Sequence, residues 1–355
     1  MRAVMHLLNR RPGPGVQMLA PVLAVCLVSA AVGATKQDAA ADAAGEEWHS
    51  ESRDLYYRIR VAVTYFPARP ELTTQVWNYL EAADDVFNDF KPASEVSRIN
   101  RLPAAGEVLL SPALEEAFAK SFYVYRLSDG MFDITCAPLR SLWRRARNAR
   151  TVPTEASIEA ARQTCGMHLA EQEGNRLRVR KAGVQFDFGG IAKGIFVDHA
   201  VAMLKAGGAR SALVQVGGET AAFGLSPRGQ PFRIAVQHPL DRTNTWCVFR
   251  DPGQGVSGST SGNYEQPIVV DGQTFYHIFN VRTGRPADTS VLSVSIVFPT
   301  TGKNWLADGL CKPGVLLGPE KTFRLLKDLD GEALFLVLEN GRVRAIPSPG
   351  WSRFE

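Results

Sequence analysis

The sequence is poor in cysteine, carries little net charge and contains no apolar run long enough to span a membrane. Five cysteines in 355 residues exclude a disulfide-dense scaffold. The formal net charge of +4 includes three arginines close to the N-terminus, which argues against a nucleic-acid-binding surface. With 45% hydrophobic and 21% charged residues, the composition is that of a globular protein rather than a disordered or fibrous chain.

Four cysteines remain once the N-terminal segment is set aside: Cys136, Cys165, Cys247 and Cys311. They are far apart and show no CxxC spacing. The sequence therefore favours four isolated thiols, with disulfides as the alternative.

Residues 1–34 have the order of a secretory signal peptide. Three arginines precede an apolar run at residues 18–32, and a Val-Gly-Ala cleavage pattern ends the segment. The run is shorter than the roughly 20 residues that span a bilayer, so we expect cleavage after Ala34 and an exported, periplasmic product. Arg10-Arg11 leaves twin-arginine export as an alternative. A lipobox-like Leu-Ala-Val before Cys26 leaves lipidation as another, and only lipidation would associate the product with a membrane.

After this segment we expect a flexible tether over residues 35–50 and one folded domain over residues 51–355. The tether is rich in alanine, aspartate, glycine and glutamate and has no apolar period. Alternating apolar residues at 57–63 then predict a strand, and helical spacing over 76–87 predicts a helix. Ser111 is expected to cap a helix with proline at its first position.

Strands and helices alternate farther along. We expect strands over residues 212–216, 232–236, 275–279, 291–298 and 334–338, and helices over residues 195–205 and 319–329. Asn340-Gly341 between two apolar runs predicts a β-hairpin. Because no internal repeat and no Pro/Gly-rich linker divides the chain, we predict one mixed α/β (α+β) domain with two lobes around a cleft.

The densest motif is FDFGGIAKG at residues 186–194, where a short apolar strand meets paired glycines and Lys193 just before a helix. Such a junction exposes backbone amides beside a cation, and the amides at a helix N-terminus favour bound phosphate. A simple tight turn at Gly189-Gly190 is the alternative, because the motif is neither a P-loop nor a GxGxxG fingerprint.

Three more clusters follow. VQVGGE ends a strand in a glycine turn that carries Glu219, and ligands gather at such strand ends. TSGNYEQ at residues 260–266 combines a hydroxyl, a glycine and an aromatic ring, which suits a polar, planar ligand. FYHIFNVRTGRP is expected to be an alternating strand that carries His277 and Arg282 toward a Thr-Gly turn. A lone strand histidine is also compatible with a structural role, and the arginine beyond it favours function.

Taken in order, these clusters resemble the ApbE family of FAD:protein FMN transferases. Its motifs GGIAKG, VxxGGD, SGDY and HIIDPRTG match residues 189–194, 214–219, 261–264 and 277–284. SEVSRIN at 94–100 and DGMFDITCAPL at 129–139 also resemble family motifs. The resemblance covers about residues 53–330 and implies a two-lobed flavin transferase fold with mixed or antiparallel sheets and a central cleft.

The resemblance also implies an activity. Members of the family move FMN from FAD onto a threonine hydroxyl of a partner flavoprotein, with magnesium, and release AMP. His277 would be the base, and Lys193 and Arg282 would contact phosphate. The implied nucleotide-binding residues are Phe90, Glu95, Asn100, Asp133, Lys193, Asp198, Glu219, Ser261, Tyr264 and His277. The implied metal ligands are the carbonyl of Ala192 and the side chain of Asp308, and the implied partners are FAD and an exported or membrane-bound flavoprotein acceptor.

Three segments depart from the family pattern. Residues 308–312 read DGLCK where the family has DALST, so Lys312 replaces a threonine that helps to hold the metal, and a protonated lysine is never a magnesium ligand. Pro313 follows directly and is expected to end the helix. Asn-Val at 280–281 replaces Asp-Pro, and Arg-Asp-Leu at 53–55 replaces Met-Gly-Thr.

The leading hypothesis is therefore an exported FAD:protein FMN transferase. The alternative is a catalytically impaired member of the same family that binds FAD without releasing AMP. A structural domain that binds no nucleotide is least favoured, because polar motif residues such as Asp133, Lys193 and Glu219 are retained.

Overall fold

The computed structural model describes residues 46–355 except residues 57, 103–104, 263–267 and 271–272. The predicted signal segment and most of the predicted tether lie outside the described residues. The tether was predicted to extend too far, because strand β1 (His49–Leu55) already pairs with β2 (Ile59–Phe66) from His49 onward. Within the described part of the chain, no helix is long and apolar enough to cross a membrane.

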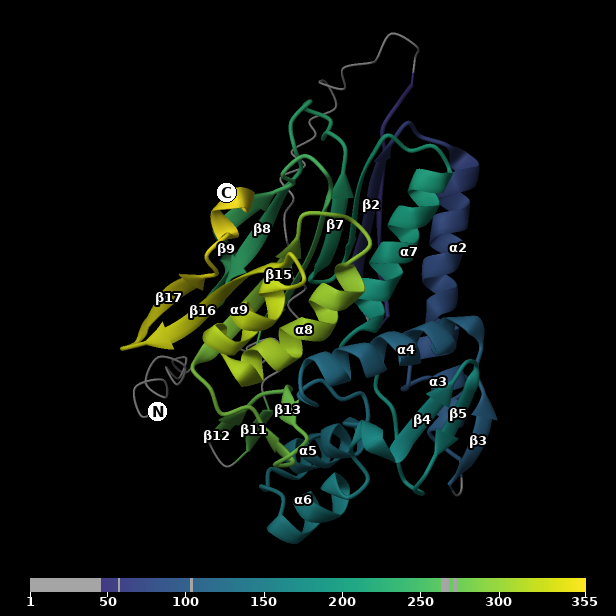
Figure 1. Ribbon diagram of the computed structural model, residues 1–355, viewed down its shortest axis with the longest axis vertical. Helices are drawn as coiled ribbons and strands as arrows, with labels where there is room; N and C mark the ends of the chain where they lie inside the picture. The colour runs from purple at the N-terminus through teal and green to yellow at the C-terminus, as the bar shows by residue number, and fades with distance from the viewer. Residues whose placement is uncertain (1–45, 57, 103–104, 263–267, 271–272) are drawn as a thin grey trace, which may run out of the picture.

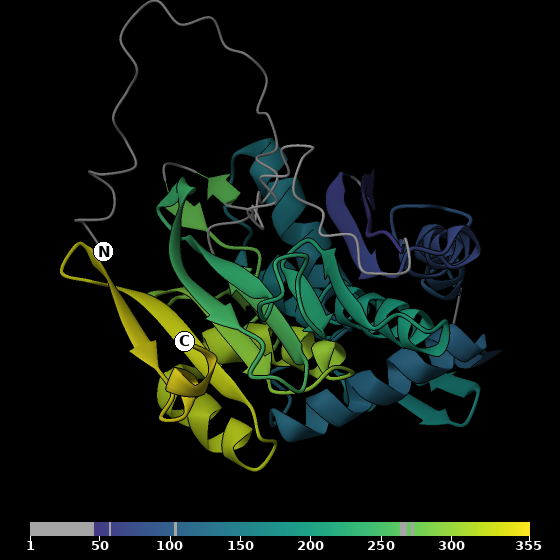
Figure 2. The ribbon, with the colours of Figure 1, turned by 90° about the horizontal axis from the view of Figure 1, so that it is seen from above.

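An eight-stranded sheet lies at the centre of the molecule (Figure 1). Every neighbouring pair is antiparallel, and the order is β1-β2-β6-β7-β10-β15-β16-β17. Figure 2 shows the hairpin of the first two strands and the hairpin of the last two at opposite sides of the molecule. The strands that follow β2 are β6 (Ser211–Val216), β7 (Glu219–Phe223), β10 (Val256–Gly262), β15 (Val291–Phe298), β16 (Glu332–Glu339) and β17 (Arg342–Pro347).

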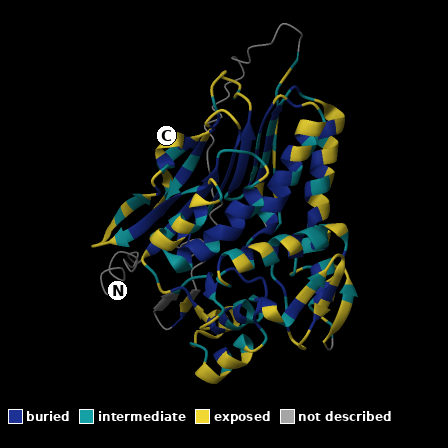
Figure 3. Cartoon of the chain, viewed as in Figure 1, coloured by how far each residue is buried: buried dark blue, intermediate teal, exposed yellow. Residues whose placement is uncertain are grey.

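Helices cover one face of this sheet: α2 (Pro70–Phe87), α7 (Ala192–Ala206), α8 (Asn304–Leu317) and α9 (Pro319–Lys327). Alternate side chains of β16 explain the arrangement, because Phe335 joins the core beneath the helices while Leu334 and Leu336 join a core on the opposite face. That opposite face is covered by the hairpin of β8 (Arg233–His238) and β9 (Asp241–Arg250) and by the C-terminal turn η2 (Trp351–Phe354). Buried residues consequently concentrate in the central strands (Figure 3).

A smaller lobe lies below the sheet in Figure 1. Helix α4 joins it to the main core through Leu114 and Phe118, both fully buried. Its helices are α3 (Glu95–Ile99), α4 (Pro112–Leu127), α5 (Ala137–Ala149) and α6 (Glu155–Arg162), with the turn η1 (Met167–Leu169). Its strands are β3 (Gly106–Leu109), β4 (Ala170–Glu173), β5 (Arg176–Val179), β11 (Ile268–Val270), β12 (Gln273–Phe275), β13 (Phe279–Asn280) and β14 (Arg285–Pro286).

Helices α7 and α8 approach each other closely at Gly194. A Cβ atom placed on Gly194 would lie 2.5 Å from the carbonyl oxygen of Asn304 and 2.7 Å from the Cα atom of Trp305. Both neighbours are backbone atoms that a side chain could not displace easily, so only glycine fits there. The contact brings the N-terminus of α7 against the first turns of α8 and sets the spacing of the site described below.

Most local predictions are confirmed. Ser111 accepts a hydrogen bond from the amide of Leu114 at 3.4 Å and caps α4, as its sequence context predicted. Asn340 and Gly341 both have positive φ and join β16 to β17 in the predicted hairpin. The four cysteines are free thiols, as favoured from the sequence.

Two local predictions are wrong. Helix α8 continues through Pro313 to Leu317, because most of its residues are buried and that packing outweighs the amide hydrogen bond that proline cannot donate. Residues 275–279 are not one strand but two short ones, with His277 in the bend between them. The apolar alternation there was misleading, since Ile278 is buried as well as Phe279.

Candidate functional site

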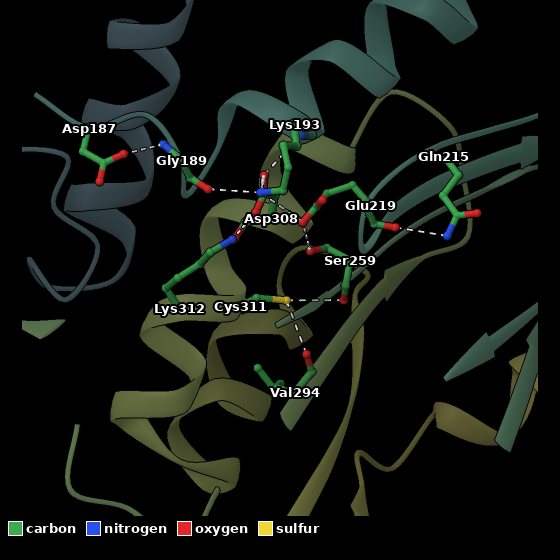
Figure 4. Close-up of polar contacts among 12 residues, drawn as sticks. Asp187, Gly189, Lys193, Gln215, Glu219, Ser259, Val294, Asp308, Cys311 and Lys312 are labelled. Carbon is green, nitrogen blue, oxygen red and sulfur yellow. Dashed lines mark hydrogen bonds and ion pairs between the residues drawn. The ribbon is translucent and has the colours of Figure 1, made fainter. Parts of the chain in front are cut away.

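Four charged side chains meet where α7, α8 and β7 come together (Figure 4). Lys193 lies in the first turn of α7, three residues after Gly190. Its Nζ atom is 3.5 Å from Oε1 of Glu219 and 3.6 Å from Oδ2 of Asp308, and it donates a hydrogen bond to the carbonyl of Gly189 at 3.0 Å. The FDFGGIAKG motif thus presents its lysine to two carboxylates from other elements.

Lys312 is the fourth member of this charge cluster. It lies one turn after Asp308 on α8, and its ammonium donates a hydrogen bond to Oδ1 of that carboxylate and another to the Asp308 carbonyl at 3.3 Å. The second carboxylate oxygen, Oδ2, accepts from the amide of Gly194 at 3.1 Å. The Asp308 side chain is wholly inaccessible to solvent, whereas those of Lys193 and Lys312 are 20% and 21% exposed.

Burial and the charges within the cluster together set the protonation of its carboxylates. Burial would raise the pKa of Asp308, but Lys193 and Lys312 hold it below its ordinary value. Burial and, after it, the negative charge of Asp308 raise the pKa of Glu219 to about 7, although the two lysines lower it. Burial would lower the pKa of Lys193, but Asp308 and Glu219 raise it above its usual range. At neutral pH the cluster therefore holds two cations, one firm anion at Asp308 and a second carboxyl that titrates.

One carboxylate oxygen of the cluster has no hydrogen-bond partner in the described part of the chain. Oε1 of Glu219 accepts a hydrogen bond from the Ser259 hydroxyl at 3.3 Å, while the buried Oε2 has no hydrogen-bond partner among the described residues. Buried polar atoms are rarely left in this state without a functional reason. Glu219 therefore has an oxygen available for a ligand.

His277 lies on the loop between β12 and β13. Its pKa is lowered to about 4, mainly by loss of contact with water and in addition by the positive charges of Lys312 and Lys193. Its buried Nδ1 atom has no hydrogen-bond partner within the described ranges. The imidazole is thus neutral at pH 7, which is the form that can accept a proton.

The implied magnesium ion does not fit this donor set. Each carboxylate oxygen of Asp308 already interacts with an ammonium group, and position 312 offers an ammonium instead of an oxygen ligand. Magnesium needs oxygen donors in near-octahedral geometry. No group of three or more His, Cys, Asp or Glu residues in the described part of the chain could hold a metal ion. Ala192, the other implied ligand, begins α7 next to Lys193.

The segment that carries Phe90, Glu95 and Asn100, three of the implied nucleotide-binding residues, lies next to the glycine motif. Asn100 accepts from the amide of Phe186 at 2.7 Å and donates to its carbonyl at 2.8 Å. Glu95 accepts from the amide of Ser111 at 2.8 Å. Both side chains thus hold backbone in place. Phe90 is 52% exposed and lies under the guanidinium groups of Arg140 and Arg144, at 4.8 and 5.4 Å from its ring centre.

Sequence reasoning missed Arg140 and its two acidic partners. Arg140 on α5 pairs with Asp187 at 2.9 Å and with the carboxylate of Asp89. Asp187 also accepts from the amide of Gly189 at 2.8 Å, so Arg140 is linked to the glycine turn through this carboxylate. An aspartate two residues before a glycine pair was a signal for such a turn, but the pairing with Arg140 is long-range and could not be inferred from the sequence.

Other predicted residues lie outside the charge cluster. Asp198 accepts from the amides of Asn304 and Trp305 at 3.0 and 2.9 Å and so caps α8 rather than facing a nucleotide. Asp133 accepts from the amides of Thr135 and Met167. Ser261 is buried in β10, and Tyr264 falls outside the described residues.

Arg282 also lies apart from the cluster. It pairs with Asp129 at 2.9 Å and lines a cavity of about 360 Å³ whose walls include Arg126, Arg162 and His168 but no member of the cluster. The structure therefore does not bring Arg282 into contact with Lys193, contrary to the shared phosphate-binding role implied by the sequence.

Solved structures and related sequences agree with this architecture. The flavin transferase ApbE from Vibrio cholerae superimposes with a TM-score of 0.76 at 26% identity and covers 87% of this chain and 100% of its own. The apo form of the Pseudomonas stutzeri flavinyl transferase ApbE gives 0.75 at 28% identity, covering 87% and 97%. The FAD:protein FMN transferase of Salmonella typhimurium is 29% identical over 79% of this chain and 81% of its own length. That of Chlamydia pneumoniae is 32% identical over 70% and 79%.

The fold, an α+β architecture with antiparallel sheets, is that of the flavin transferases. The profile of the ApbE family matches residues 54–335. The chain belongs to the ApbE family, and the resemblance and fold class predicted from its motifs are confirmed.

Proposed function

We propose that the chain is an FAD:protein FMN transferase. Family membership supports the proposal, and so do relatives that carry this activity in their names. The single observation that carries it is the contact of Lys193, at the N-terminus of α7, with Asp308 and with Glu219, whose second carboxylate oxygen has no partner among the described residues. An anionic phosphate finds cations and helix amides there, and the charges of Lys193 and Lys312 act on the buried imidazole of His277, a proton acceptor.

In the proposed reaction the acceptor threonine hydroxyl attacks the phosphorus atom of the FMN half of FAD. A new phosphorus–oxygen bond forms, and the bond from that phosphorus to the bridging oxygen breaks. AMP leaves with the bridging oxygen. His277 takes the hydroxyl proton, and the ammonium groups balance the charge that develops on the phosphate oxygens. The reaction needs no oxidant or reductant.

The charge cluster also favours a second candidate, an FAD-binding protein with impaired transfer. Lys312 occupies Oδ1 of Asp308 where the family uses a metal ligand. If an ammonium stabilises the transition state less well than a divalent cation does, FAD would bind and AMP would form slowly or not at all.

The experiment that separates these candidates follows both products. The chain from residue 35 onward is incubated with FAD and with a flavoprotein that a related transferase modifies. AMP is measured by chromatography, and covalent flavin is read as fluorescence of the acceptor in a denaturing gel. We expect AMP and flavinylated acceptor in equal amounts. Saturable FAD binding without either product would select the second candidate, and absence of binding would exclude both.

We also propose that the chain acts in the periplasm on an exported or membrane-bound flavoprotein. The support is the signal-peptide order of residues 1–34. N-terminal sequencing of the protein recovered from a periplasmic fraction is expected to begin at Thr35. A lipid-modified start at Cys26 would show membrane anchoring, and an uncleaved product in the cytoplasm would contradict export.

A further inference from the structure

Lys312 holds the place at Asp308 that a divalent cation would need. Asp308 is fully buried, and the ammonium groups of Lys193 and Lys312 interact with its two carboxylate oxygens from different helices (Figure 4). Breaking the contact with Lys312 to admit a metal would leave an ammonium beside a doubly charged ion, which costs Coulomb energy.

The charge balance of the cluster leads to the same conclusion. Lys193 and Lys312 bring two ammonium groups to the single carboxylate of Asp308, which both of them contact. Two positive charges that converge on one carboxylate favour an anionic ligand and oppose a further cation. A neutral side chain at position 312 would remove one positive charge and make the site suitable for a cation.

The side chain of Lys312 is 21% exposed, so a ligand can reach its ammonium group. Its Cε and Cδ atoms lie 3.8 and 3.9 Å from the point where a Cβ of Gly190 would be, and a ring atom of Phe132 lies 3.2 Å from that point, so the lysine packs along the glycine turn. The turn leads into α7, whose N-terminal amides favour anions. The unpartnered Oε2 of Glu219 lies in the same cluster.

We propose that Lys312 supplies the positive charge that anchors the FAD pyrophosphate in this chain, so that FAD binds independently of divalent cations. The inference rests on the proposed function in one respect, namely that FAD is the ligand. It goes further by assigning a residue to the anchoring charge and by removing the metal requirement from binding.

The test compares FAD affinity in EDTA and in excess magnesium for the wild type and three variants. Lys312→Thr removes the charge, Lys312→Arg keeps it, and Lys321→Thr makes the same change as the first variant at an exposed position of α9. Affinity is measured by calorimetry and flavin fluorescence, and a thermal melt confirms that each variant is folded. Magnesium alone is also titrated into each protein.

We expect the wild type, Lys312→Arg and Lys321→Thr to bind FAD equally well in both buffers. Lys312→Thr is expected to lose about 10- to 100-fold in affinity in EDTA, the cost of one charge-assisted hydrogen bond, and to regain part of it with magnesium. Magnesium alone is expected to give binding heat only with Lys312→Thr.

A wild-type FAD affinity that is at least tenfold lower in EDTA than in magnesium, a difference of about 1.4 kcal/mol, would overturn the inference. The proposed function would still stand. Equal affinity of Lys312→Thr and wild type in EDTA would also overturn it. EDTA-resistant binding without any AMP release would instead overturn the proposed function and leave the role of Lys312 supported. Absence of FAD binding in either buffer would overturn both.

Discussion

Replacement of His277 by alanine is expected to lower the rate of AMP release from FAD about 100- to 10,000-fold, the range that general-base catalysis contributes. The imidazole is neutral at pH 7, its buried Nδ1 atom has no partner among the described residues, and it is affected by the charges of Lys312 and Lys193. FAD affinity is expected to change little, because Lys193 and Lys312 still provide the positive charge. The measurement is a single-turnover rate of AMP formation beside a titration of FAD affinity.

His199→Gln is the matched control for this variant. His199 lies on α7 and its ring contacts Glu116 at 2.7 Å, away from the charge cluster. Glutamine can keep that hydrogen bond, so activity is expected to stay at the wild-type level. A His277→Ala protein that released AMP at the wild-type rate would remove His277 from the mechanism. A loss confined to FAD affinity would show that the imidazole binds the nucleotide instead of accepting a proton.

Replacement of Asp308 by asparagine is expected to lower the free energy of unfolding by about 3 kcal/mol, because it removes the anion that compensates two partly buried ammonium groups. The estimate is at the lower end of the range for broken buried pairs, since the side chains of Lys193 and Lys312 retain some exposure to water. Urea unfolding followed by tryptophan fluorescence provides the measurement.

Two comparisons make this result specific. Glu320→Gln breaks an ion pair with Arg324 whose side chains are 85% and 71% exposed, and it is expected to cost less than about 0.5 kcal/mol. Adding Lys312→Met to Asp308→Asn is expected to restore part of the stability, because one uncompensated charge is removed. If Asp308→Asn were no more destabilising than Glu320→Gln, the buried charge cluster would not contribute to folding as described.

Elements whose cause is local were predicted well from the sequence. The cap at Ser111, the hairpin at Asn340-Gly341 and the apolar face of α2 each depend on residues a few positions apart. Two predictions, that the helix ends at Pro313 and that residues 275–279 form one strand, were wrong for the same reason. In both places burial among distant elements decided the conformation and outweighed the local preference.

The candidate site was predicted in part. Motif order identified Lys193, Glu219 and Asp308, and the structure brings them together with Lys312. The order of the motifs could not show where the side chain of Arg282 lies, and in the structure it pairs with Asp129 away from the cluster. A motif fixes which residues lie near one another in sequence, whereas the direction of a side chain on a loop depends on what packs against that loop.

The central sheet has its first and last strands at its two edges, and this order bears on aggregation. Strand β16 is buried along most of its length and reads Ala-Leu-Phe-Leu-Val-Leu between its terminal glutamates, an uncharged apolar run with no proline. Only β17, which carries Arg342 and Arg344, separates its backbone from solvent at that edge. A chain emerging from the ribosome exposes β16 until β17 follows. The last hairpin thus protects the chain from intermolecular strand pairing, and proteolysis within β17 would convert a stable edge into a template for fibril growth.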